Sequence, residues 1–312
     1  MEFMMKCSIP VEDLKDLVTV LFVWIDDLYR QYVPLSIQCR RHKDKAILSD
    51  SEIVTLAVLG DILSTGSENA WIAYVRKNWS DLFPRMCERS RFNRLRRQLY
   101  AVISQIRIAL GAQLDGTMDP LRIIDSLPLP VCVFGRARYV KAFKGENAQY
   151  GYCASKKETY FGYKIHALCT ANGYITDFLL TPASTDDRDA VWELLDTYQH
   201  HLTLIGDKGY MGAAFAENLQ TEKGVVLLTL KRRNTKHPAP SSLNRAVFHI
   251  RRRIETSFSQ LTGQFNMTRV YAKTLWGLTA RLQSKILAYN LCFAINLLNG
   301  CEHPAWIKSL AF

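Results

Sequence analysis

The chain has 312 residues, of which 48% are hydrophobic and 22% charged, and its 40 Lys plus Arg exceed its 29 Asp plus Glu by 11 charges. This apolar content, with only 16 Gly and 10 Pro, excludes a disordered acidic tail, a collagen and a small disulfide scaffold. The length predicts about two domains, and the pI of 9.3 favours a polyanionic partner such as nucleic acid.

Residues 1–115 are expected to form an all-α domain, because few strand-like alternations occur there. Ser49 and Glu52 predict a capping box at the start of a helix. The apolar stretch Leu17–Ile25 is too short to span a membrane, and the uncharged run Ile286–Cys301 is interrupted by asparagines, so both are predicted to be buried helices. No secretory leader is apparent, and the expected location is the bacterial cytoplasm, with association to the nucleoid when DNA is bound.

An arginine-rich amphipathic helix is predicted near the end of this region, over about 89–110. Apolar residues recur at helical spacing through it, and six arginines lie within the thirteen residues 85–97, five of them in its early half. A solvated basic face is the alternative, but crowded arginines repel one another and are easier to explain opposite phosphates. The residues expected to contact DNA here are Arg89, Arg91, Arg94 and Arg97.

A domain boundary is predicted at 111–120, after which strands and helices alternate. The expected strands are 121–125, 161–170, 174–181, 201–206 and 225–230, and the expected helices are 190–198, 213–220 and one that starts near 245. This is the order of a ribonuclease-H-like fold, with a mixed five-stranded sheet and flanking helices. The predicted domains are therefore 1–115 (DNA-binding), 116–270 (catalytic) and 271–312 (a basic helical extension).

The excess positive charge is concentrated near the C-terminus. Residues 223–301 hold thirteen basic residues and one acid, Glu255, for a net +12, whereas the remaining 27 bases and 28 acids sum to −1. Glu255 could be an i,i+4 partner of Arg251 or Arg252 on a helix. The other interpretation is a metal-binding carboxylate inside a polyanion-binding surface.

Three acids stand at informative positions in the predicted order. Asp125 ends the first strand, Asp207 ends the fourth, and Glu255 lies on the helix after the fifth. The first and fourth strands are neighbours in this fold, so these carboxylates are expected to converge. Oxygen ligands of this kind suit Mg²⁺ or Mn²⁺, and two such ions can activate the attacking oxygen and stabilise the leaving one in phosphoryl displacement. A cap or turn role is the default for any single Asp at a strand end.

With separations of 82 (207−125) and 48 (255−207), these acids resemble the Asp-Asp-Glu triad of bacterial insertion-sequence transposases. Asp-Lys-Gly-Tyr at 207–210, Pro-Ala-Ser-Thr-Asp-Asp-Arg-Asp at 182–189 and Arg-Arg-Ile-Glu-Thr-Ser-Phe-Ser-Gln-Leu at 252–261 are similar to the group of these elements numbered nine-eighty-two. The resemblance implies a metal-dependent transposase that cleaves transposon ends and joins the 3′-hydroxyl to target DNA. A related group has Tyr, Arg and Lys around the glutamate where this chain has Phe248, Arg251 and Thr262.

The expected partners are double-stranded DNA, as terminal inverted repeats and as target, and a second copy of the chain on that DNA. Besides the arginines of 89–97, the predicted DNA contacts are Lys208, Lys231, Arg232, Arg233, Arg251 and Arg252. No nucleotide-binding motif is present, and the eight cysteines lack zinc spacing and are expected to be reduced, most of them in the core. A nuclease of the same fold without strand transfer, or a non-catalytic DNA-binding relic, is the alternative.

Overall fold

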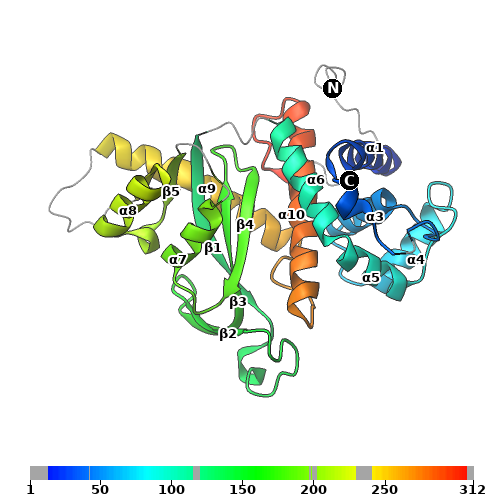
Figure 1. Ribbon diagram of the computed structural model, residues 1–312, viewed down its shortest axis with the longest axis horizontal. Helices are drawn as coiled ribbons and strands as arrows, with labels where there is room; N and C mark the ends of the chain where they lie inside the picture. Colours follow the sequence, from blue (N-terminus) through cyan, green and yellow to red (C-terminus); the bar gives the residue numbers. More distant parts are fainter. Residues whose placement is uncertain are drawn as a thin grey trace. The chain divides into compact units, whose positions relative to one another are not determined.

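A computed structural model describes residues 13–41, 43–114, 120–196, 198, 202–229 and 241–307. The chain divides into two compact units (Figure 1). The helical unit comprises residues 1–114, 260–270 and 275–312, and the sheet unit comprises residues 115–259 and 271–274.

In the helical unit, the helices Asp50–Ile62 and Leu275–Leu298 are largely buried. Its helices are α1 (Leu14–Tyr32), α2 (Leu35–Gln38), α3 (Asp50–Ile62), α4 (Glu68–Asn78), α5 (Arg89–Gln98), α6 (Tyr100–Gln113) and α10 (Leu275–Leu298). The predicted capping box is confirmed, because the Ser49 side chain accepts from the Glu52 backbone and the Glu52 side chain accepts from the Ser49 backbone. Within the described residues, no helix is long and apolar enough to cross a membrane.

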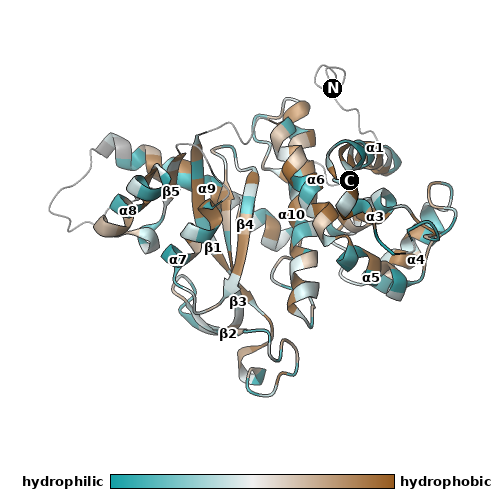
Figure 2. Cartoon of the chain, in the orientation of Figure 1, coloured by the Kyte–Doolittle hydropathy of each residue, from teal (hydrophilic) through white to brown (hydrophobic). Residues whose placement is uncertain are grey.

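The arginine-rich segment forms two helices, so the prediction of a single helix over 89–110 is wrong. The break falls at Leu99, whose ψ of 13° departs from helical geometry. No Gly or Pro stands at this position, so no helix-breaking residue explains the break. Leu99 is a buried residue, with 1% of its surface exposed. The hydrophilic colouring of α5 in Figure 2 reflects its arginines.

The sheet unit contains a six-stranded mixed sheet. Its strands are β1 (Leu121–Pro130), β2 (Gln149–Cys153), β3 (Glu158–Cys169), β4 (Ile175–Pro182), β5 (Leu202–Gly206) and β6 (Val225–Thr229), in the order β2-β3-β1-β5-β6 with β4 also paired to β3. Its helices are α7 (Asp187–Leu195), α8 (Ala213–Lys223) and α9 (Ser241–Gly263), and η2 (Phe134–Arg136) and η3 (Lys208–Tyr210) are single 3₁₀ turns. The order β4-β3-β1-β5-β6, with β1, β5 and β6 parallel, confirms the ribonuclease-H-like fold, and β2 is an additional short strand.

Strand β1 runs to Pro130, so the prediction that it ends at Asp125 is wrong. Beyond Ile123 the strand has no partner on the β5 side, while it stays paired to β3 through Pro130↔Gly162. Val131 donates its N–H to Phe161 of β3. Backbone groups alternate along a strand, so the backbone nitrogens of residues 128 and 130 point away from β3, to the side where β5 has ended. Proline is tolerated there because no N–H is needed.

Opposite faces of the sheet receive different helices. Ile124 and Leu204 lie in a buried cluster with Val191 of α7 and Leu219 of α8. Residues one position away on the strands, such as Ile123 and Ile205, point to the other face. Both are almost completely buried.

Seven of the eight cysteines are described, and all seven are free thiols. Only Cys87, Cys169 and Cys292 are buried, so the prediction that most cysteines lie in the core is wrong. Cys7 lies outside the described residues.

Candidate active site

Asp125 and Asp207 occupy equivalent positions on adjacent parallel strands. The last paired residues of β1 and β5 are Ile123 and Ile205, and each aspartate follows its isoleucine by two residues. Because side chains alternate along a strand, both aspartates point to the face on which those isoleucines are buried. Parallel pairing therefore brings together two carboxylates that are 82 residues apart (207−125).

The Asp125 carboxyl lies in an environment that disfavours its charge. Burial raises its pKa to about 6, opposed by the hydrogen bond from the Ser126 N–H and by the charge of Arg251. Asp207 and Glu255 raise the pKa further by repulsion. Both acids are therefore within electrostatic reach of Asp125, and a bound cation would relieve this repulsion.

Glu255 is positioned by helix α9. The adjacent Ile254 is fully buried, and Glu255 lies beside it with a half-exposed side chain. Its Oε1 accepts hydrogen bonds from Nη2 and Nη1 of Arg251, at 2.6 and 3.1 Å. The interpretation of Glu255 as an i,i+4 ion-pair partner is thus confirmed for Arg251, and it coexists with proximity to Asp125.

Asp207 is held by a tight turn. Its Oδ1 accepts a hydrogen bond of 2.7 Å from the Gly209 N–H within η3. A Cβ placed on Gly209 would lie 2.9 Å from Asp207 Oδ1 and 3.4 Å from Asp187 Oδ2. Asp187 therefore sits next to Asp207, and the turn leaves no room for a side chain between them.

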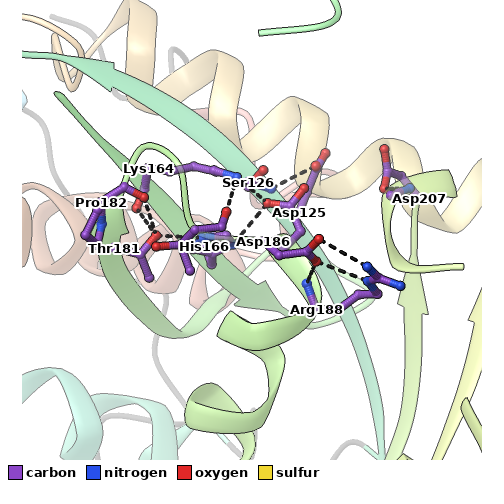
Figure 3. A network of polar contacts seen from close by, with 12 residues as sticks. Asp125, Ser126, Lys164, His166, Thr181, Pro182, Asp186, Arg188 and Asp207 are labelled. Carbon is purple, nitrogen blue, oxygen red and sulfur yellow. Dashed lines mark hydrogen bonds and ion pairs between the residues drawn. The ribbon is translucent and has the colours of Figure 1, made fainter. Parts of the chain in front are cut away.

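A polar network lies on the α7 side of the sheet, with Lys164, His166 and Thr181 labelled in Figure 3, and Asp187 belongs to it. Its Oδ1 accepts a 2.7 Å hydrogen bond from Lys164 Nζ, which also donates to the Thr185 carbonyl. His166 is fully buried, with Nε2 3.0 Å from Thr181 Oγ1. Burial lowers the pKa of His166 to about 4, so its 3.7 Å approach to Asp187 is not an ion pair at neutral pH.

Asp187 and Lys164 are site neighbours that are not among the predicted catalytic or DNA-binding residues. Acids that precede a helix usually cap it, and Asp186 does cap α7 by accepting from the Arg188 N–H. One residue further, Asp187 turns toward Asp207. The sequence does offer a signal for Asp187: three aspartates stand at the start of this helix, whereas an N-cap needs only one.

The donor set suits a hard divalent cation, although the ligands do not converge as they stand. Within the described residues, no three His, Cys, Asp or Glu side chains lie close enough together to hold a metal ion. The carboxylate of Glu255 is instead occupied by its ion pair with Arg251 on the same helix. Three carboxylates supply the oxygen ligands that Mg²⁺ and Mn²⁺ prefer.

The arginines predicted to bind DNA differ in availability within the helical unit. Arg91 and Arg94 are exposed on α5. Arg89 lies 3.8 Å from the Glu68 carboxylate, and the Arg97 guanidinium lies 5.0 Å from the ring centre of Trp276. Of these four arginines, only Arg91 and Arg94 form neither a side-chain ion pair nor a ring contact with any described residue.

In the sheet unit, Lys208 and Arg252 are exposed, and Arg251 is occupied by Glu255. The predicted contacts Lys231, Arg232 and Arg233 lie outside the described residues.

The strand order defines a ribonuclease-H-like fold, with Asp125 and Asp207 just beyond the last paired residues of β1 and β5. A family model described as "Transposase DDE domain" matches residues 116–291, which is more than half of the chain. The chain belongs to this family. It is a transposase, and membership implies DNA binding and the use of divalent metal ions. No curated protein and no solved structure matches the chain.

Proposed function

We propose that this transposase belongs to an insertion sequence of the nine-eighty-two group. It hydrolyses a phosphodiester at each transposon end and then joins the freed 3′-hydroxyl to target DNA by direct transesterification. The observation that carries the proposal is the equivalent placement of Asp125 and Asp207 beyond the Ile123↔Ile205 pair.

Asp125, Asp207 and Glu255 are the residues that would hold the metal ions, two Mg²⁺ or Mn²⁺ per site. The ions, when bound, would stabilise charge on the attacking and leaving oxygens. Burial and repulsion raise the pKa of Asp125 to about 6, and a bound cation would lower it again. Glu255 would exchange Arg251 for the metal, leaving the guanidinium available to a DNA phosphate.

DNA recognition is assigned to both units. Residues 1–115 would bind the terminal inverted repeats through Arg91 and Arg94, residues 116–270 would perform the chemistry, and residues 271–312 would add basic contacts. Two ends must be paired before joining, so the active species is proposed to be a homodimer on double-stranded DNA.

The test uses the DNA ends that flank the gene for this chain, labelled and incubated with purified protein in Mg²⁺. Asp125→Asn, Asp207→Asn and Glu255→Gln should each lower cleavage about a thousandfold or more, while DNA binding changes little. Asp189→Asn, an exposed acid in the first turn of α7, is the matched control and should cleave normally. Normal cleavage by Asp125→Asn would refute the assignment.

Strand transfer separates this function from that of a nuclease with the same fold. A pre-cleaved end with a free 3′-hydroxyl should be joined to plasmid DNA by the wild-type protein and not by Glu255→Gln. Cleavage without joining under these conditions would favour the nuclease.

A further inference from the structure

The segment after β1 exposes a group of aromatic side chains. Phe134 and Tyr139, on the segment 131–148 at the lower edge of Figure 1, are 53% and 84% exposed, and Tyr150 and Tyr152 on β2 are 47% and 65% exposed. These four residues are here named the aromatic patch. Four large exposed rings within residues 134–152 are uncommon on a surface that has no partner.

The patch rests on an ordered support. Phe143 is buried and packs its ring 5.5 Å from that of Tyr163 on β3. The Tyr163 hydroxyl donates a 2.6 Å hydrogen bond to the Glu146 carbonyl, and the Phe143 N–H donates to the Lys273 carbonyl. The segment is therefore fixed by buried contacts while Phe134 and Tyr139 remain outside.

The rings of Phe134, Tyr150 and Phe161 form a row. Phe134 lies 6.0 Å from Tyr150, and Tyr150 lies 5.0 Å from Phe161, its cross-strand partner on β3. Tyr152 follows Tyr150 by two residues and so projects from the same face of β2. The row presents flat, partly exposed aromatic surface along one face of the sheet.

Basic residues are frequent in the same part of the chain as this row. Residues 131–157 contain six basic residues and one acid, Glu146. All six bases are exposed, and none forms an ion pair with any residue that the structure describes; they are Arg136, Arg138, Lys141, Lys144, Lys156 and Lys157. Exposed aromatic rings among unpaired cations fit a ligand that has both flat bases and phosphates.

The patch lies on the same face of the sheet as Asp125. Asp125 pairs with Ala167 of β3, and Phe161 is six residues from Ala167, an even number, so both point to one face. Five residues separate Asp125 from Pro130, where the patch segment begins (130−125). At about 3.4 Å per residue this is roughly 17 Å along β1.

We propose that the aromatic patch binds unpaired DNA bases a few nucleotides from the phosphate that is cleaved. Bases in an intact duplex are stacked on each other, so rings can stack only on bases of a single or opened strand. The proposal rests on the function proposed above, which places the scissile phosphate at Asp125. The patch would hold one strand of an opened transposon end, with the surrounding lysines and arginines on its phosphates.

The test compares a fluorescein-labelled 20-nucleotide oligo(dT) with a 20-base-pair dA·dT duplex by anisotropy, using the full chain in buffer without divalent ions. Tyr139→Ala and Tyr152→Ala should each weaken binding of the single strand about tenfold and leave duplex binding within twofold. Tyr139→Phe and Tyr152→Phe keep the rings and should bind as wild type. Tyr32→Ala, an exposed tyrosine on α1, is the control.

A second readout locates the contact. Oligo(dT) carrying 5-iododeoxyuridine should cross-link under long-wavelength ultraviolet light to peptides within 131–157. Cross-links only elsewhere, unchanged binding by the Tyr139→Ala/Tyr152→Ala double variant, or equal losses for single strand and duplex would overturn the proposal. So would a change of oligomeric mass in that variant, which would make the patch a contact between copies.

These measurements involve no cleavage, so the two proposals fail separately. Normal cleavage by Asp125→Asn would remove the proposed active site and leave the single-strand result intact. Unchanged single-strand binding would remove the aromatic patch and leave the active site intact.

Discussion

Arg251 donates two hydrogen bonds to Glu255 one turn further along α9, the shorter at 2.6 Å. A metal ion must displace this ion pair before it can bind the Glu255 carboxylate. Arg251→Ala should therefore tighten Mn²⁺ binding about two- to fivefold, the size of a partly exposed ion pair. Isothermal titration with Mn²⁺ and no DNA measures this change.

Arg252→Ala provides the matched control, since Arg252 is the exposed neighbour on the same helix. Its Mn²⁺ affinity should equal that of the wild type. Equal affinities for the Arg251→Ala and wild-type proteins would show that Glu255 is not a ligand or that Arg251 does not restrain it.

Gly209 gives a steric prediction at the other carboxylate. A Cβ at this position would lie 2.9 Å from Asp207 Oδ1, so Gly209→Ala should displace the carboxylate and lower cleavage by about ten- to a hundredfold. Gly66→Ala, where a Cβ would meet nothing within 4 Å, should cleave normally. A fully active Gly209→Ala protein would argue against a role for the Asp207 carboxylate in its present position.

His166 predicts a loss of stability in acid. Burial lowers its pKa in the folded protein to about 4, whereas an unfolded histidine titrates near 6.5. Between these values only the unfolded state takes up the proton, so stability falls as the pH drops from about 6.5 towards 4. Thermal unfolding measured across this range should show a shallower fall for His166→Gln than for wild type.

The control for this pH series is His249→Gln, at an exposed position on α9. It should reproduce the wild-type dependence of unfolding temperature on pH. If His166→Gln and wild type lose stability in parallel, other groups cause the acid sensitivity.

Glu68 neutralises buried arginines in the helical unit. It accepts hydrogen bonds from Arg96 at 2.8 Å and from Arg281 at 2.9 Å, and Arg96 is only 6% exposed. Glu68→Ala should lower the free energy of unfolding of this unit by about 3–5 kcal/mol, because it leaves buried charge unpaired. Urea unfolding followed by circular dichroism is the measurement.

The comparison for Glu68 is Glu88→Ala, which removes an exposed partner of Arg76. That loss should be at most about 1 kcal/mol. Similar losses for both variants would mean that the Glu68 network is as well solvated as a surface pair.

Local patterns along the chain were sufficient for most elements of the sheet unit. The alternation at 161–170 and 174–181 around Asn172-Gly173 predicted the β3–β4 hairpin, because a two-residue period and a turn dipeptide are local properties. Local patterns did not predict features that depend on contacts with distant parts of the chain. Pro128 and Pro130 fit within β1 only because β5 has already ended on that side, and the break at Leu99 has no marker in the sequence.

The sequence by itself determined the chemistry available to this protein: one acid in a strongly basic segment, two more at strand ends, and residue types that suit a divalent cation. Only the tertiary structure decided how those groups are arranged. Register pairs Ile123 with Ile205 and so places Asp125 and Asp207 at equivalent positions, helical spacing couples Glu255 to Arg251, and the turn at Gly209 brings Asp187 beside Asp207. It also gathered the aromatic patch, since Phe134 meets Tyr150 only through the pairing of β2 with β3. Residue types are fixed by the chain, whereas distances between residues far apart in sequence depend on how strands and helices pack.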